Sequence, residues 1–154
     1  FAAARALLDE SEEERPALPG RRGDEPFTDF RDFDDVFSGV AEMVFQGKYT
    51  WFPLEQARSL EPNQPKKLRD LLWPWARITA DDGTSGDVFL FALYPGSAAH
   101  ADDLVKLGRM TDWKTLADEL QAGQGLRSYL VDEEEISLFE LGPVEFDAPE
   151  AEPS

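Results

Sequence analysis

The hydrophobic and polar positions of the chain change period several times, and each change marks an expected element. Residues 1–15 place a few apolar side chains on one helical face before Pro16, which predicts a helix that ends there. Between residues 33 and 43, phenylalanine and valine recur every three or four positions beside a group of aspartates. This spacing predicts a second, buried helix. Shorter helical patterns occur at 54–60, 66–73 and 101–107.

Apolar runs joined by turn residues predict β-hairpins in the middle of the chain. Gln46-Gly47 joins two runs within 43–52, and Asp81-Asp82-Gly83 joins two within 75–94. Two further strands are expected within 126–141. Hairpins with a few separate helices indicate an α+β fold, in which an antiparallel β-sheet of hairpins packs against a few helices.

Composition divides the chain into four expected segments. Residues 1–15 are interpreted as the end of an upstream helical region, and 16–28 as a linker rich in proline and glycine. Residues 29–141 form the expected α+β domain, and the acidic, proline-containing residues 142–154 are expected to be a disordered tail. Because the first residue is phenylalanine, we also expect that part of the protein lies upstream.

The chain is strongly acidic, with 32 acidic and 15 basic residues among 154 and a net charge of −17. Nucleic acids and anionic membrane surfaces attract positive charge, so neither is an expected partner. The absence of cysteine excludes disulfides and thiolate zinc sites. No apolar run approaches the roughly 18–20 residues that span a membrane, and no signal peptide is visible. The absence of cysteine also fits a reducing compartment.

Catalytic and cofactor chemistry finds little support in the sequence. His100 is the only histidine, which excludes a two-histidine metal site within this chain, and a lone histidine beside a helix start is most simply a surface residue. Carboxylate pairs are so numerous that chance explains them, and the aspartates at 29–35 are explained most simply by a helix N-terminus. Neither a phosphate-binding loop nor a dinucleotide fingerprint occurs. We expect no catalytic residue, no cofactor and no metal.

Residues 47–78 differ from the rest of the chain in charge and in tryptophan content. Six basic and three acidic residues give this segment a charge of +3, against −20 for the remainder, and three of the four tryptophans lie here. Tryptophan and arginine dominate binding hot spots. Aromatic side chains in strands also commonly fill a core, however, so core packing is the simplest interpretation of Trp51 and Trp75. The exposed basic residues are therefore the stronger candidates for contacts.

Five segments resemble, in order, the signature segments of the ImpE/SciE family, also called TagJ-like proteins. They are GKYTWFPLEQARSL at 47–60, LRDLLW at 68–73, LYPGS at 93–97, DDLVKLGRMTDW at 102–113 and GQGLR at 123–127. The resemblance implies a cytoplasmic accessory protein of bacterial type VI secretion that binds the small subunit of the contractile sheath. It implies neither catalytic residues nor a cofactor. Gln46 departs from the family pattern, which has asparagine before the hairpin glycine.

The leading functional hypothesis is a non-enzymatic adaptor that binds a sheath component, through a docked helix or an added strand. An alternative is a small-ligand-binding or hydrolytic domain with a pocket near Asp70, Arg109 and Asp112. A third is a structural domain that orients the upstream part. The candidate protein-binding residues are Arg58, Lys66, Lys67, Arg69, Asp70, Trp73, Arg109 and Asp112.

Overall fold

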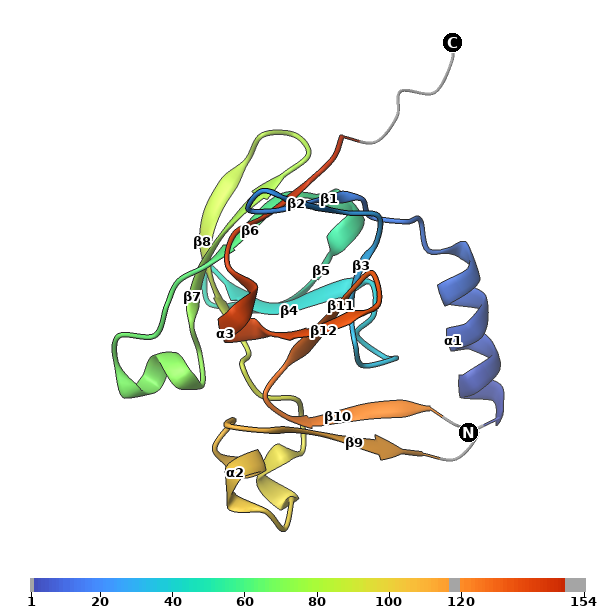
Figure 1. Cartoon of the computed structure of the whole chain (residues 1–154), viewed down its shortest axis with the longest axis vertical. Coiled ribbons are helices and arrows are strands. Elements are labelled where there is room, and N and C mark those ends of the chain that lie inside the picture. The colour runs from blue at the N-terminus through green and yellow to red at the C-terminus, as the bar shows by residue number, and fades with distance from the viewer. Residues whose placement is uncertain (1, 117–119, 149–154) are drawn as a thin grey trace.

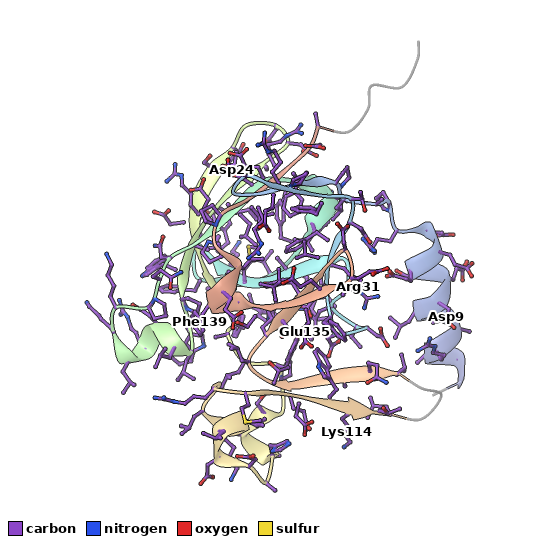
Figure 2. The ribbon with its side chains drawn as sticks, in the orientation of Figure 1. Asp9, Asp24, Arg31, Lys114, Glu135 and Phe139 are labelled. Carbon is purple, nitrogen blue, oxygen red and sulfur yellow. The ribbon has the colours of Figure 1, made fainter. Side chains whose placement is uncertain are left out.

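The computed structural model describes residues 2–116 and 120–148 and confirms the α+β class (Figure 1). The helix α1 (Ala2–Glu14) agrees with the predicted N-terminal helix, whose first residue, Phe1, lies outside the described residues. Figure 1 shows α1 along one side of the molecule, beside the strands. Arg31 reaches from the strands toward α1, and its Nη1 lies 3.3 Å from Glu12 Oε1 (Figure 2). Charged contacts therefore attach the helix to the domain.

An eight-stranded sheet forms the body of the molecule, and all its pairings are antiparallel. Both predicted hairpins of the middle region are confirmed as neighbouring pairs within it. From one edge to the other, its strands are β2 (Glu25–Phe27), β1 (Gly20–Arg22), β13 (Val144–Phe146), β6 (Ala57–Pro62), β7 (Trp75–Ala80), β8 (Ser85–Leu90), β4 (Val40–Phe45) and β5 (Lys48–Pro53).

Two smaller sheets and several short helices complete the described fold. The three-stranded sheet has the order β12 (Glu134–Ser137), β11 (Ser128–Val131) and β3 (Phe30–Asp32), and β10 (Gln121–Gly125) pairs with β9 (Thr111–Thr115). The short helices are η1 (Leu54–Gln56), η2 (Leu68–Leu71), η3 (Ser97–Ala99), α2 (Asp103–Lys106) and α3 (Leu138–Leu141).

The hydrophobic core lies where the eight-stranded sheet meets the three-stranded sheet. Phe30 of β3 is fully buried, with its ring 5.1 Å from that of Tyr129 and 5.3 Å from that of Phe146. Met43 and Leu90 contribute aliphatic side chains from the paired strands β4 and β8. Burial of such side chains contributes about 1.5–3 kcal/mol each, so residues from both ends of the chain stabilise one domain.

The expected linker and tail are wrong in part, because both supply strands. β1 and β2 lie within 16–28, and β13 lies within 142–154, where Val144 and Phe146 are buried. Strand β13 pairs with β1 on one side and with β6 on the other. The prolines and charged residues of these two segments predicted irregular structure. Their apolar residues instead become buried, because the segments pair with strands that are distant in sequence. Residues 149–154 of the expected tail lie outside the described residues.

The predicted helix over 33–43 is wrong, and the aspartates beside it explain why. Asp32 Oδ1 accepts the backbone N–H of Asp34 at 2.9 Å. Asp34 Oδ1 in turn accepts those of Val36 at 2.8 Å and Phe37 at 3.3 Å. Such side-chain bonds compete with the helical ladder and form a turn instead. The aspartates therefore do not lie at a helix N-terminus, and the chain enters β4 at residue 40.

The remaining local predictions hold in part. The segment at 54–60 becomes the single turn η1 followed by strand β6, while 66–73 and 101–107 contain η2 and α2. The last predicted strand, within 136–141, becomes the end of β12 and the short helix α3. Strand β9 was not predicted, and the glycine-containing residues 123–125, which the sequence indicates as a loop, instead form the end of β10.

Candidate protein-binding surface

Five of the eight candidate residues lie together on η2 and the chain around it: Lys66, Lys67, Arg69, Asp70 and Trp73. Asp70 is buried, and its Oδ2 accepts the backbone N–H groups of Lys66 at 3.0 Å and of Lys67 at 3.1 Å. The Lys66 bond is the main cause that lowers the pKa of Asp70, followed by the Lys67 bond. Asp70 thus holds the turn, which leaves the cationic side chains exposed to solvent.

The helix α2 and the residues after it expose a second set of apolar side chains. Asp102 Oδ1 accepts the backbone N–H of Leu104 at 2.9 Å and so caps α2, while Val105 is buried. Gly108 has φ +69, and a Cβ there would lie 2.6 Å from Leu93 Cδ2 and 4.0 Å from the Leu71 carbonyl oxygen. The tight contact at position 108 is therefore with Leu93, while the Leu71 carbonyl shows that the chain after α2 reaches the end of η2 at an ordinary contact distance.

Both η2 and α2 expose apolar side chains beside basic ones, and the chain after α2 contacts the end of η2. Leu68 is 83% exposed and Leu107 is 60% exposed, although exposed leucines of this size cost free energy of hydration. We call this the η2–α2 surface. Its apolar members are Leu68, Leu72, Trp73, Leu104, Leu107 and Met110, and its basic members are Lys66, Lys67, Arg69, Lys106 and Arg109.

Two candidate residues lie outside this surface. Arg58 is on β6, where its Nη2 lies 3.6 Å from Asp81 Oδ1, at the end of the strand opposite to η2. Asp112 is on β9, and its Oδ2 lies 2.7 Å from His100 Nε2. The hydrogen bond to His100 is the main cause that lowers the pKa of Asp112. Both residues are therefore engaged in contacts of their own.

The pocket expected near Asp70, Arg109 and Asp112 does not form around these three residues. A cavity of about 430 Å³ beside η2 is lined by Asp70 together with Lys66, Lys67, Arg69 and Trp75 among others, but by neither Arg109 nor Asp112. Within residues 2–116 and 120–148, no group of three or more His, Cys, Asp or Glu is placed to hold a metal ion.

The tryptophans of the 47–78 segment are more exposed than expected. Trp51 and Trp75 lie in strands, as predicted, but they are 47% and 37% exposed, and Trp73 is 49% exposed. Trp75 stacks on Phe89 with 3.6 Å between ring centroids. The expectation that Trp51 and Trp75 fill the core is therefore wrong, because both project from the sheet.

A buried charged cluster lies behind the exposed surfaces, and sequence reasoning did not find it. Arg127 is 2% exposed, and its Nη1 donates to Asp32 Oδ2 at 2.6 Å while its Nη2 donates to Glu42 Oε1 at 2.8 Å. Its Nε donates to the Phe91 carbonyl oxygen at 2.9 Å. The guanidinium also lies 4.6 Å from the centroid of the Tyr94 ring. One side chain thus joins β3, β4 and the chain after β8.

Tyr94 completes this cluster. Its hydroxyl donates to Asp32 Oδ1 at 2.6 Å and accepts the backbone N–H of Ser128 at 3.0 Å. Burial is the main cause that raises the pKa of Tyr94, with the Asp32 charge next, so its hydroxyl keeps its proton. In the described residues, no buried side-chain nitrogen or oxygen lacks a hydrogen-bond partner. The cluster is thus fully satisfied, as stable buried charges require.

The only sequence signal for the cluster was the segment 123–127, which ends in Arg127. Nothing in the local pattern identified its partners, because Asp32 and Glu42 lie 95 and 85 positions away. Asp32 was interpreted as one of several carboxylates at a helix N-terminus. Pairing of β3 with β11 is what brings it to Arg127.

Comparisons with known proteins agree with the sequence resemblance. The family model described as ImpE protein matches residues 24–145. The type VI secretion system accessory component TagJ of Pseudomonas aeruginosa is 37% identical over 149 residues, which cover 97% of this chain and 52% of that protein. The crystal structure of protein VPA1032 from Vibrio parahaemolyticus superposes with a TM-score of 0.85 at 29% identity, covering 94% of this chain and 54% of that one. The chain therefore spans about half the length of these relatives.

Proposed function

Because the chain belongs to the ImpE family, we propose that it is a non-enzymatic accessory module of bacterial type VI secretion. In this proposal it binds a sheath component, the small subunit, through the η2–α2 surface in the cytoplasm. The observation that carries the proposal is the set of exposed apolar and basic side chains on that surface. No helix in the described residues is long and apolar enough to cross a membrane.

The chemistry of the η2–α2 surface favours an amphipathic, acidic partner segment. Leu68 and Leu107 would lose their exposed area to water on binding, at about 25 cal/mol per Å² of apolar area. On η2 and just before it, close to Leu68 in the sequence, Arg69 and Lys66 provide positive charge in a chain whose net charge is −17. Opposite charge at the rim of an interface speeds association and selects the partner more than it adds affinity. A helix with one apolar face and acidic neighbours matches both features.

Binding of the purified sheath small subunit, measured by isothermal titration calorimetry, tests the proposal. The variant Leu107→Asp places a charge in the apolar part of the surface, and we expect at least tenfold weaker binding, about 1.4 kcal/mol. Leu7→Asp is the matched control, because Leu7 is 66% exposed on α1. The proposal fails if wild-type protein does not bind, or if both variants bind like the wild type.

A ligand-binding function is less well supported. The cavity beside η2 has basic side chains, but Asp70, its one carboxylate, already accepts two backbone hydrogen bonds. Arg109 and Asp112, the other residues of that hypothesis, are absent from its lining. A general acid or base must reach the substrate proton, and Asp70 is occupied in holding the turn.

A further inference from the structure

The two edges of the eight-stranded sheet are protected very differently. β2, at one edge, has only three residues and contains Pro26 and Glu25. Short length, proline and charge are the usual means by which proteins prevent another strand from pairing with an edge. β5, at the other edge, has six residues, and its one proline is the last of them, Pro53. In the described chain β5 pairs only with β4.

The register of the β4–β5 hairpin shows which backbone groups of β5 are free. Gln46 and Gly47 form the turn with φ values of +50 and +77, and Phe45 and Lys48 are the first pair beside it. The pair next to a two-residue turn exchanges both hydrogen bonds, and bonding then alternates along an antiparallel ladder. Tyr49 and Trp51 therefore direct their N–H and C=O groups away from β4.

The side chains of Tyr49 and Trp51 are exposed but held in place beside this edge. Trp51 Nε1 donates to the Tyr49 hydroxyl at 2.7 Å, and that hydroxyl donates to the buried carboxylate of Glu42. The Trp51 ring lies 5.1 Å from that of Phe37, and the Tyr49 ring lies 5.6 Å from that of Phe91. Ordered aromatic side chains lose little conformational entropy when a partner covers them.

The opposite face of β5 offers a small apolar hollow. It has a volume of about 110 Å³, and its lining includes Phe45, Thr50, Phe52 and Gly86. Thr50 and Phe52 alternate with Tyr49 and Trp51 along the strand, so an added strand would meet apolar groups on both faces. In this arrangement, main-chain hydrogen bonds provide affinity and alternate side chains provide specificity.

The charge around β5 indicates what kind of segment fits. Between residues 44 and 54, Lys48 is the only charged side chain, and it is exposed. A carboxylate of an added strand would therefore meet a cation at the Lys48 end and no acidic group along the edge. A second copy of this chain fits less well, because each copy carries a net charge of −17.

We infer that β5 accepts an extended segment of a partner protein as a ninth, antiparallel strand. The segment has apolar residues at alternating positions and an acidic residue near its C-terminal end, which an antiparallel arrangement places beside Lys48. Hydrogen bonds to Tyr49 and Trp51 hold it. This site uses neither η2 nor α2, so it stands or fails independently of the sheath-binding surface.

Two short synthetic peptides of alternating valine and threonine test the inference, one with glutamate at its C-terminal end and one with glutamate at its N-terminal end. Amide hydrogen exchange of the isotope-labelled chain is followed by NMR. We expect the C-terminal-glutamate peptide to slow exchange at Tyr49 and Trp51 by at least about tenfold at saturation, and the other peptide to act more weakly. Unchanged exchange with both peptides, or equal effects of both, would overturn the inference.

The variants Trp51→Pro and Trp51→Ala separate the backbone from the side chain. Proline removes the outward N–H without removing a bond to β4, whereas alanine removes only the ring. We expect no peptide protection at Tyr49 in Trp51→Pro and weakened protection in Trp51→Ala. Slow exchange at Thr50 and Phe52 confirms that each variant keeps its hairpin. Equal peptide binding by the two variants contradicts the inference. Protection of Tyr49 that rises with protein concentration without peptide would instead assign the edge to a second copy.

Discussion

Two arginine–aspartate contacts in this molecule use the same chemical groups in opposite ways. Arg127 Nη1 lies 2.6 Å from Asp32 Oδ2, and both side chains are almost fully buried. Arg69 Nε lies 3.8 Å from Asp70 Oδ1, and the Arg69 side chain is 57% exposed. Water screens the second pair, while burial makes the first both strong and costly to break. Arg127 is therefore expected to determine folding, whereas Arg69 remains available for a partner.

The largest effect is expected from Arg127→Ala. The change leaves Asp32 and Glu42 buried without their cation, which typically costs about 3–5 kcal/mol of unfolding free energy. Urea denaturation followed by circular dichroism measures this loss. If the variant is too unstable to purify, Arg127→Lys can replace it, because lysine keeps the charge but only part of the hydrogen bonding. We expect Arg127→Lys to lower the unfolding free energy as well, but by less than Arg127→Ala. A loss below about 1 kcal/mol for Arg127→Ala would contradict the assigned role.

A smaller effect is expected from Gly123→Ala, which acts on the same buried cluster through packing. A Cβ at position 123 would lie 2.3 Å from Tyr94 Cε2. The Tyr94 ring cannot move away easily, because its hydroxyl is bonded to Asp32. Overpacking of this kind costs about 1–3 kcal/mol, measured by thermal unfolding. Gly39→Ala is the control, because a Cβ there would meet only the Arg15 side chain, at 3.4 Å, and the loss of stability should be smaller. Gly47→Ala is not a suitable control, because the positive φ at Gly47 would itself strain an alanine.

Acidification is expected to loosen η2 through protonation of Asp70. The Lys66 and Lys67 backbone bonds lower the pKa of Asp70 below its unfolded value. A carboxyl with a lowered folded pKa stabilises the fold above the unfolded pKa, about 3.9, and this contribution is lost as pH falls through the folded value. NMR titration of the Lys66 and Lys67 amides measures the change, and Asp70→Asn should flatten it. Amides that stay unchanged below pH 3.9 would contradict the role of Asp70.

The smallest effect on folding is expected from Arg69→Ala. An exposed ion pair at 3.8 Å contributes about 0–1 kcal/mol, so unfolding should shift by less than about 0.5 kcal/mol. Binding of the sheath small subunit should nevertheless weaken, with reduced salt dependence, if the η2–α2 surface makes that contact. Arg21→Ala on β1 is the matched control for lost positive charge. A loss of folding in Arg69→Ala would contradict this prediction and would show that Arg69, like Arg127, stabilises the fold.

Sequence reasoning was most accurate where structure is local. The turns at Gln46-Gly47 and Asp81-Asp82-Gly83 were predicted because glycine and its neighbours adopt the required positive φ. It failed at 33–43, because periodic apolar residues favoured a helix while Asp32 and Asp34 formed local turns. The clustering of Lys66, Lys67 and Arg69 followed from their closeness in sequence. The contact between the chain after α2 and the end of η2 did not.

The sequence by itself determined the class of fold, the family and the basic, tryptophan-containing segment, because turn chemistry and signature segments are local properties. Only the tertiary structure decided which arginine is buried and which strand ends the sheet. Arg127 meets Asp32 and Glu42 through strand pairings distant in sequence. Strand β5 ends the sheet because, in the described chain, β4 alone pairs with it. The burial of a side chain and the position of a strand at a sheet edge depend on the whole fold, because both are set by neighbours that are distant in sequence.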